Sequence, residues 1–199
     1  MKSSAPEAVF SPPERRRLLG VARNAICEYV LRDRLPEPVS PGIHDVRRGA
    51  FATLRQAGRL RGCMGRPDST EPLDTLVAVC AVLAATRDPR FSPVRPEEVS
   101  ALEIELSILA PAWSVPPAEA LEQIVPGVHG LVVARGALRG LLLPQVATEQ
   151  RWGALRFLEE TCRKAGLPAQ AWRDEETRIE LFTAEVFSES ECVGQSGGI

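Results

Sequence analysis

The strongest constraint on the fold of this chain is a sequence pattern that occurs twice in its middle. Residues 127–143, GVHGLVVARGALRGLLL, align without gaps onto residues 49–65, GAFATLRQAGRLRGCMG, at an offset of 78 residues. Five of the seventeen positions are identical: Gly49/Gly127, Gly58/Gly136, Leu60/Leu138, Arg61/Arg139 and Gly62/Gly140. Each segment reads as two short strands joined by a glycine-containing turn, which is typical of a β-hairpin. Self-similarity of this kind predicts an internal duplication.

The elements expected after each hairpin recur in the same order. A helix opened by Thr70 stops before Asp88 and is followed by a strand over residues 102–109; a helix opened by Thr148 is followed by a strand over residues 178–187. We therefore predict an α+β fold with two repeated hairpin-helix-strand units, at about residues 46–109 and 127–187. Their strands are expected to form one curved, largely antiparallel, barrel-like sheet with helices packed on it.

The two ends of the chain differ from its middle. Ser11, Pro12 and Glu14 fit an N-cap serine, a proline at the first helical position and a capping-box glutamate, so a first helix is expected to begin there and to end near Arg34. Residues 1–10 and 188–199 lack the periodicity of packed elements. We interpret both as mobile tails that flank one domain over residues 11–187.

Composition excludes several classes of protein. No stretch approaches the roughly 18 apolar residues of a membrane span, and the first residues hold no apolar run of signal-peptide length, so a cytoplasmic protein is expected. The five cysteines are widely spread without a CxxC pair, and only two histidines are present. Neither disulfides, nor a metal site, nor a cofactor is predicted.

The charge is unevenly distributed. The formal net charge of −2 disfavours a general surface for nucleic acids. However, no acidic residue occurs between Val46 and Pro67, a window that holds six arginines. This segment is locally basic, so binding of nucleic acid or nucleotide through it stays open as an alternative.

The most chemically loaded segment is LRGCMG, which lies within the basic window. Arg61, Gly62, Cys63, Met64 and Gly65 combine a guanidinium, a thiol and two flexible backbone positions, so they are candidate ligand-binding residues. One interpretation treats Cys63 as a small buried hydrophobe. The other treats it as a reactive thiolate that faces a cleft and is favoured by the nearby arginines.

The remaining candidate residues also have two interpretations each. Arg61 is either a solvated or ion-paired strand residue or an anion-binding one, and Asp88 and Arg90 form either a capped turn or part of a ligand site. His129 is either a core or edge histidine or the general base for Cys63. His44 is the other histidine that could act as this base. The three tryptophans, Trp113, Trp152 and Trp172, are expected in the core or against helices.

Several motifs, in the right order, resemble the signature segments of the AMMECR family. They are LRGCMG, DPRF at residues 88–91, EIELS at 103–107, GVHGL at 127–131, GLLLPQV at 140–146, Trp152 and CRKAGL at 162–167. The similarity spans about residues 11–187, and Met64 departs from the isoleucine usual in the family. The resemblance implies repeated β-rich units, a barrel-like sheet, a smaller subdomain and an LRGC hairpin that borders a cleft. It also implies a context, because bacterial relatives commonly accompany, or are fused with, a Memo-type protein and a radical S-adenosylmethionine enzyme.

The resemblance implies no settled activity, so function rests on the candidate site. The leading hypothesis is a non-catalytic or co-catalytic component of such a redox or radical system, which presents the LRGC-lined cleft to a partner or to a small anionic ligand. The first alternative is an enzyme with Cys63 as nucleophile or redox thiol. The second is nucleic-acid binding through the arginine-rich hairpin.

Overall fold

The computed structural model describes residues 9–34 and 48–194. These residues form two compact units. The Cys63 unit holds the described residues up to Leu109 and those from Glu185 onward, and the His129 unit holds Ala110–Ala184. His44 lies outside the described residues, so its predicted role is not addressed by the structure. No helix in the described residues is long and apolar enough to cross a membrane.

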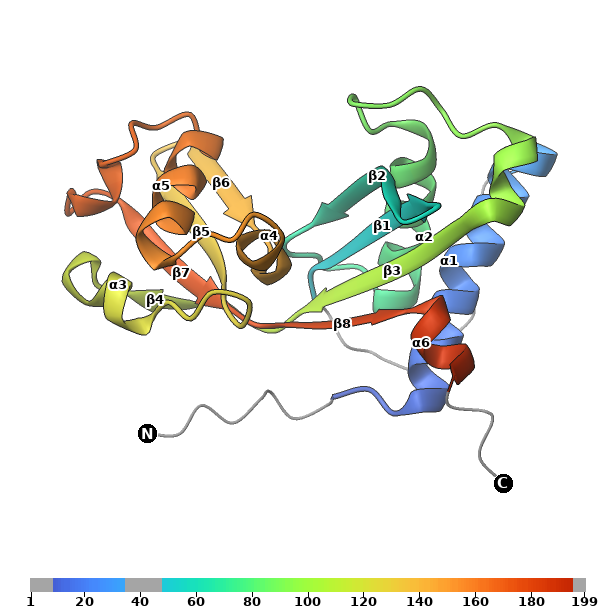
Figure 1. Cartoon of the computed structure of the whole chain (residues 1–199), viewed down its shortest axis with the longest axis horizontal. Coiled ribbons are helices and arrows are strands. Elements are labelled where there is room, and N and C mark those ends of the chain that lie inside the picture. The colour runs from blue at the N-terminus through green and yellow to red at the C-terminus, as the bar shows by residue number, and fades with distance from the viewer. Residues whose placement is uncertain (1–8, 35–47, 195–199) are drawn as a thin grey trace. The chain divides into compact units, whose positions relative to one another are not determined.

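The Cys63 unit contains a four-stranded sheet in the order β2-β1-β3-β8 (Figure 1). Its strands are β1 (Ala50–Gln56), β2 (Arg59–Arg66), β3 (Leu102–Leu109) and β8 (Ala184–Ser188). Its helices are α1 (Pro12–Arg32), α2 (Leu73–Thr86), the 3-10 helix η1 (Pro96–Ala101) and α6 (Glu189–Gly194). β1 pairs in antiparallel fashion with both β2 and β3, which places the hairpin beside the strand that the sequence predicted.

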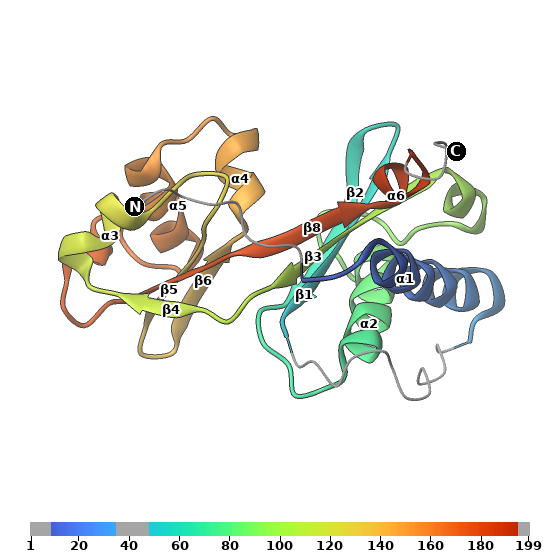
Figure 2. The same cartoon turned by 90° about the horizontal axis from the view of Figure 1, so that it is seen from below.

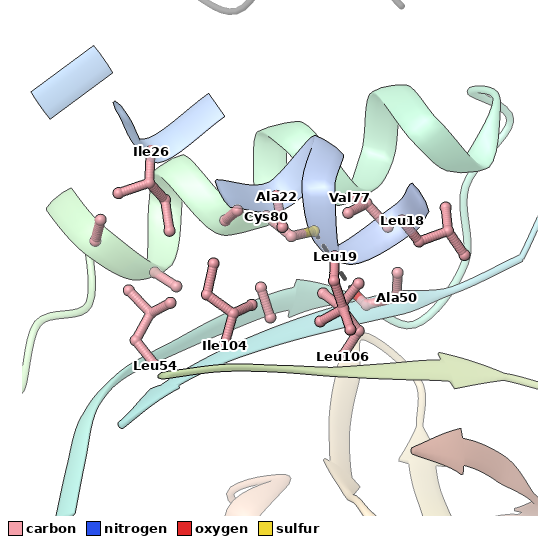
Figure 3. Packing of buried hydrophobic residues seen from close by; sticks show 14 of the residues in the cluster. Leu18, Leu19, Ala22, Ile26, Ala50, Leu54, Val77, Cys80, Ile104 and Leu106 are labelled. Carbon is pink, nitrogen blue, oxygen red and sulfur yellow. Dashed lines mark hydrogen bonds between the residues drawn. The ribbon is translucent and has the colours of Figure 1, made fainter. Parts of the chain in front are cut away.

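Helices α1 and α2 lie side by side against the sheet of the Cys63 unit (Figure 2). Alternate residues of β1 and β3 point toward these helices, because side chains alternate across a strand. The core between the layers is fully buried and includes Leu18, Ala22, Ile26, Ala50, Leu54, Leu76, Val77, Cys80, Ile104 and Leu106 (Figure 3). Burial of these apolar side chains drives the packing of this unit.

The His129 unit repeats this arrangement around a second sheet, in the order β4-β7-β5-β6 (Figure 1). Its strands are β4 (Trp113–Val115), β5 (Gly130–Arg135), β6 (Leu138–Leu142) and β7 (Arg178–Phe182). Its helices are α3 (Ala120–Gln123), α4 (Pro144–Glu149) and α5 (Ala154–Lys164), with 3-10 turns η2 (Pro117–Glu119) and η3 (Ala171–Arg173). A separate core includes Leu131, Val133, Phe157, Leu158, Ile179 and Leu181.

The α+β class and the duplication agree with the sequence analysis, whereas the single barrel-like sheet was wrong. The described residues form two four-stranded sheets, and neither closes into a barrel. Each hairpin pairs with its own third strand, β3 or β7, and buries its apolar side on its own helices. Since each repeat forms its own core, the two hairpins need not share a sheet. The chain that follows β3 forms β4, which is the fourth strand of the second sheet. The chain that follows β7 forms β8, which is the fourth strand of the first sheet.

Two glycines shared by the hairpins have equivalent roles. A Cβ atom on Gly62 would lie 2.1 Å from the carbonyl oxygen of Ala84 in α2, and one on Gly140 would lie 2.5 Å from the backbone nitrogen of Ala165 after α5. Both positions let the backbone at the end of a helix approach the sheet. Close packing of helix on sheet therefore explains the repeated glycine.

The two hairpins differ by one residue. In the first, Leu54 pairs with Gly62 and Arg55 with Leu60, so Arg61 is the extra residue of a bulge. In the second, Val133 pairs with Gly140 and the register has no shift. The gapless sequence alignment therefore holds for the second strand of each hairpin and is displaced by one residue in the first.

The ends of the described chain differ from the expected tails. The capping box forms, because the Glu14 carboxylate accepts hydrogen bonds from the Ser11 N–H at 2.7 Å and its hydroxyl at 2.6 Å. Phe10, placed in the N-terminal tail by the sequence analysis, is 2% exposed and belongs to the core. Residues 189–194, placed in the C-terminal tail, form α6, whose Glu189 binds Arg23 and the N–H of Ile104.

Candidate functional site

Cys63 lies in β2 within a row of side chains that crosses three strands. The register pairs Cys63 with Thr53 in β1, and Thr53 with Glu105 in β3. Their neighbours Leu54 and Ile104 point into the core beneath α1 and α2. Because directions alternate along a strand, Cys63, Thr53 and Glu105 occupy the opposite side of the sheet. We name this side the Cys63 face.

The sulfur of Cys63 has a specific polar neighbour. The Thr53 hydroxyl donates a hydrogen bond to Cys63 Sγ at 3.3 Å. Cys63 is half-buried, whereas Cys80 and Cys162 are buried. Burial raises the pKa of Cys80 to about 11 and also raises that of Cys162, so these two thiols fit the description of small buried hydrophobes. Cys63 differs from them in both exposure and hydrogen bonding.

The backbone of Cys63 is held by Asp88, in the turn after α2. The Asp88 carboxylate accepts the Cys63 N–H at 2.8 Å. It also accepts the Arg90 backbone N–H at 3.0 Å and two guanidinium bonds at 2.9 and 2.7 Å. The Arg90 guanidinium holds the pKa of Asp88 down at about 2, against the opposing effect of burial. Asp88 is 4% exposed, so it is a fixed, ionised anchor for the strand.

Arg61 fastens the segment after Asp88 to the hairpin. Its guanidinium binds both carboxylate oxygens of Glu98, at 2.8 and 3.0 Å, and donates to the carbonyls of Ser92 at 2.9 Å and Pro93 at 3.3 Å. The hydrogen bond from Arg61 lowers the pKa of Glu98 to about 2. The ion-pair interpretation of Arg61 therefore describes its observed contacts, and any anionic ligand would compete with Glu98.

The other predicted residues of the LRGCMG segment have packing roles in the structure. Gly62 contacts α2, as described above, and Met64 packs against the core of the Cys63 unit. A Cβ atom on Gly65 would lie 2.3 Å from the ring of Phe51, which covers this glycine from the neighbouring strand. A ligand-binding role for these three residues stays a prediction.

The second hairpin supplies an internal comparison for the Cys63 row. The equivalent row consists of Leu141, Val132 and Glu180 on β6, β5 and β7. The glutamate is present in both rows, whereas the thiol and its hydroxyl donor occur together in the first row alone. The pairing of a thiol with a hydroxyl is therefore a specialisation of one repeat and not a requirement of the duplicated fold.

His129 belongs to the other unit and contacts its own surroundings. Its Nδ1 lies 3.0 Å from the Gln123 carbonyl and 3.2 Å from the Val125 N–H, and its ring packs edge-on against Trp113 with centroids 5.5 Å apart. These contacts match the interpretation of an edge histidine that stabilises a turn. Its role as a base for Cys63 stays a prediction.

Three residues of the site were missed by the sequence analysis: Thr53, Glu105 and Glu98. The hairpin register could have identified Thr53 by counting back from the turn, if the bulge at Arg61 were known. The tryptophan prediction was wrong for Trp113, which is 40% exposed at the edge strand β4, whereas Trp172 is buried. No group of three or more histidine, cysteine or acidic side chains placed to hold a metal occurs within residues 9–34 and 48–194.

Comparisons with known proteins agree with one another. The AMMECR1 family model matches residues 19–187. A protein of Methanothermobacter thermautotrophicus is 46% identical, over 92% of this chain and 97% of its own length. A protein of Thermococcus gammatolerans is 43% identical over 86% and 88% of the two chains. The crystal structure of the uncharacterized protein PH0010 from Pyrococcus horikoshii superposes with a TM-score of 0.85 at 39% identity, covering 90% of this chain and 93% of that one.

Proposed function

The chain belongs to the AMMECR1 family, and we propose that it acts as a binding component that presents one fixed thiol, Cys63, to a partner. The observation that carries this proposal is the double restraint on Cys63. Thr53 donates to its sulfur at 3.3 Å, and Asp88 accepts its backbone N–H at 2.8 Å. A side chain held in one position on a rigid strand recognises a partner with little further loss of conformational entropy.

A binding role fits the surroundings of Cys63 better than a catalytic one. An adjacent base within hydrogen-bond reach is a common means of activating a nucleophilic cysteine. No histidine occurs among the described residues of the Cys63 unit. Asp88 has a pKa of about 2 and is bound to Arg90, which makes it a poor proton acceptor near neutral pH. The carboxylate in the same row, Glu105, is separated from Cys63 by the intervening strand β1.

The contacts of the arginines favour a partner protein over a small anion. Arg61 and Arg90 are engaged with Glu98 and Asp88, so an anionic ligand would have to displace a carboxylate from each. A protein surface that contacts Cys63 needs no such exchange. The family resemblance implies an association with a Memo-type protein and a radical S-adenosylmethionine enzyme. These two proteins are therefore the first partners to test.

Calorimetric titration tests this proposal directly. The purified chain is titrated with a Memo-type protein and with a radical S-adenosylmethionine enzyme from the same organism, as wild type and as Cys63→Ser. The matched control is Cys27→Ser, because Cys27 is also half-buried but lies in α1. We expect wild type and Cys27→Ser to bind alike and Cys63→Ser to bind about tenfold more weakly, which corresponds to roughly 1.4 kcal/mol.

Two results would contradict the proposal. The first is equal binding by wild type and Cys63→Ser, which would remove the thiol from the interface. The second is the absence of heat with both proteins, together with covalent turnover of a thiol-reactive substrate at Cys63, which would favour the enzymatic alternative.

A further inference from the structure

Strand β2 lies at the edge of its sheet and carries backbone groups that point outward. Within residues 9–34 and 48–194, the sheet order β2-β1-β3-β8 leaves one side of β2 without a strand neighbour. The N–H of Cys63 points to this side, since it binds Asp88 and not β1. In an antiparallel pair, outward-pointing groups recur at every second residue, so the N–H and carbonyl of Gly65 point to the same side.

The outward-pointing backbone groups of Cys63 and Gly65 have different surroundings. At Cys63, the carboxylate of Asp88 takes the place that a carbonyl of an added strand would occupy. At Gly65, neither backbone group has a hydrogen-bond partner in the part of the chain that the structure describes. Unpaired donors and acceptors on an edge strand form a template for another extended chain.

The other hairpin lacks this feature. The edge strand β6 ends at Leu142, and the residue equivalent to Gly65, Leu143, is the N-cap of α4, which begins with Pro144. β2 is eight residues long, whereas β6 has five. Short edge strands and prolines are the usual means of preventing strand addition, and they occur in the repeat without the thiol.

We propose that the edge of β2 beside Cys63 binds an extended peptide segment of the partner by strand addition. The inference rests on the proposed function, because it names the kind of partner that the Cys63 site receives. The segment pairs with the N–H and carbonyl of Gly65, and Asp88 limits its extent at Cys63. Main-chain hydrogen bonds supply affinity in this mode, and alternate side chains supply specificity.

A hollow at the end of β2 offers a site for one of those side chains. It is lined by Arg66, Asp68, Ser69, Thr70 and Glu71, which follow Gly65 in the chain. Arg66 binds Glu71 at 3.3 Å, and Ser69 and Thr70 add two hydroxyls to the lining. We expect a polar side chain of the segment, able to form hydrogen bonds with these hydroxyls, to enter this hollow.

The test uses a phage-displayed library of random decapeptides selected on the full chain. The best peptide is then synthesised with single N-methyl groups at successive positions. Methylation of the residue whose N–H pairs with the Gly65 carbonyl is expected to weaken binding about fivefold or more, and methylation of the residues on either side of it to have little effect, because one hydrogen bond contributes about 1 kcal/mol.

A change in the protein backbone supplies the matched control. An ester at the Met64–Gly65 linkage removes the Gly65 N–H without adding a side chain, which is needed because a Cβ there would meet the Phe51 ring. The control ester is at the Trp152–Gly153 linkage, where the glycine N–H also has no partner in the described residues. We expect the first ester, and not the second, to weaken the peptide about fivefold.

Each outcome decides the matter. Failure to select any peptide, uniform sensitivity to N-methylation, or equal effects of the two esters would overturn strand addition. Repeating the measurement with Cys63→Ser separates this inference from the proposed function. Sensitivity to N-methylation that is confined to the residue paired with Gly65 and persists in Cys63→Ser supports strand addition even if the thiol has no role. Thiol-dependent partner binding without this position-specific sensitivity leaves the proposed function and removes strand addition.

Discussion

The hydroxyl of Thr53 lies 3.3 Å from the sulfur of Cys63, on directly paired residues of β1 and β2. The equivalent pair in the second repeat is Val132 and Leu141, which cannot form such a bond. The contact is therefore a property of one hairpin and not of hairpins of this kind in general. It gives the proposed binding thiol a defined orientation, and it can be removed by a change that nearly preserves shape.

Replacement of Thr53 by valine should slow the alkylation of Cys63. The variant Thr53→Val keeps the branched shape but removes the donor to the sulfur, so we expect a rate roughly two- to tenfold lower, the range for one hydrogen bond. Native labelling with iodoacetamide at fixed pH, followed by peptide mass spectrometry, measures the rate, with Cys27 and Cys192 as internal references. Thr53→Ser should retain the wild-type rate; equal slowing in both variants would show that the hydroxyl is not responsible.

Alanine at either repeated glycine should destabilise its own unit. In Gly62→Ala and Gly140→Ala, the new methyl group would meet backbone atoms at 2.1 and 2.5 Å, so the helix end must move. We expect each to lower the free energy of unfolding by about 1–3 kcal/mol, as overpacking does, measured by urea denaturation.

The control for these two variants is Gly20→Ala. Gly20 lies inside α1, and an added Cβ there would have nothing within 4 Å. Alanine is favoured over glycine in a helix interior by about 0.5–1 kcal/mol, so this variant should be more stable than the wild type. Destabilisation by all three changes would indicate a general intolerance of substitution and not a helix–sheet contact.

The fold was predictable where local signals were strong. Ser11 and Glu14 marked the start of α1, and the repeated Gly62 and Gly140 marked equivalent hairpins. The strand expected over residues 178–187 instead divides into β7 and β8, which belong to different sheets. Periodicity describes which side of a strand is buried but not which strand lies beside it, so the two-sheet arrangement was not accessible from one sequence.

The candidate site was predictable in part, for the same reason. Cys63, Arg61, Asp88 and Arg90 were identified by residue type, and the structure brings Asp88 to Cys63 and Arg90 to Asp88. Thr53 and Glu98 were missed, because their partners are set by hairpin register and by tertiary contact. Neither of these leaves a short-range signal in the sequence.

Stability should fall as pH decreases from about 4 to about 2, and Asp88 should account for part of this loss. The folded pKa of Asp88 is about 2, below the roughly 3.9 of an unfolded aspartate, so its contribution is present above pH 4 and disappears as pH falls through 2. Glu98 titrates over the same window in the same direction. Asp88→Asn should be less stable than wild type at pH 7 and should approach it at pH 2, as measured by urea midpoints across pH.

The control for Asp88→Asn is Glu97→Gln. Glu97 precedes Glu98 in the chain, is exposed and has no ion pair in the described residues. Its pH profile should run parallel to that of the wild type. If Asp88→Asn also runs parallel, the carboxylate does not provide the stabilisation that its contacts with Arg90 and Cys63 indicate.

Loss of Arg61 should loosen the segment from Asp88 to Glu98 while the hairpin remains folded. Its guanidinium binds the Glu98 carboxylate and the carbonyls of Ser92 and Pro93, and the side chain is 13% exposed, so it bridges β2 to this segment with limited competition from water. We expect Arg61→Ala to cost about 1–3 kcal/mol of unfolding free energy, as for hydrogen bonds to charged groups. Hydrogen exchange should accelerate at Val94 and Glu98, whose N–H groups bind Ala85 and Arg95. Arg61→Lys should rescue little, because an ammonium cannot reproduce the two-pronged contact with Glu98.

The control for Arg61→Ala is Arg59→Ala. Arg59 is an exposed residue of the same strand with no partner in the described part of the chain, so its loss should leave both measurements unchanged. Equal effects of Arg61→Ala and Arg59→Ala would mean that the local positive charge, and not the contact with Glu98, holds the segment beside Cys63.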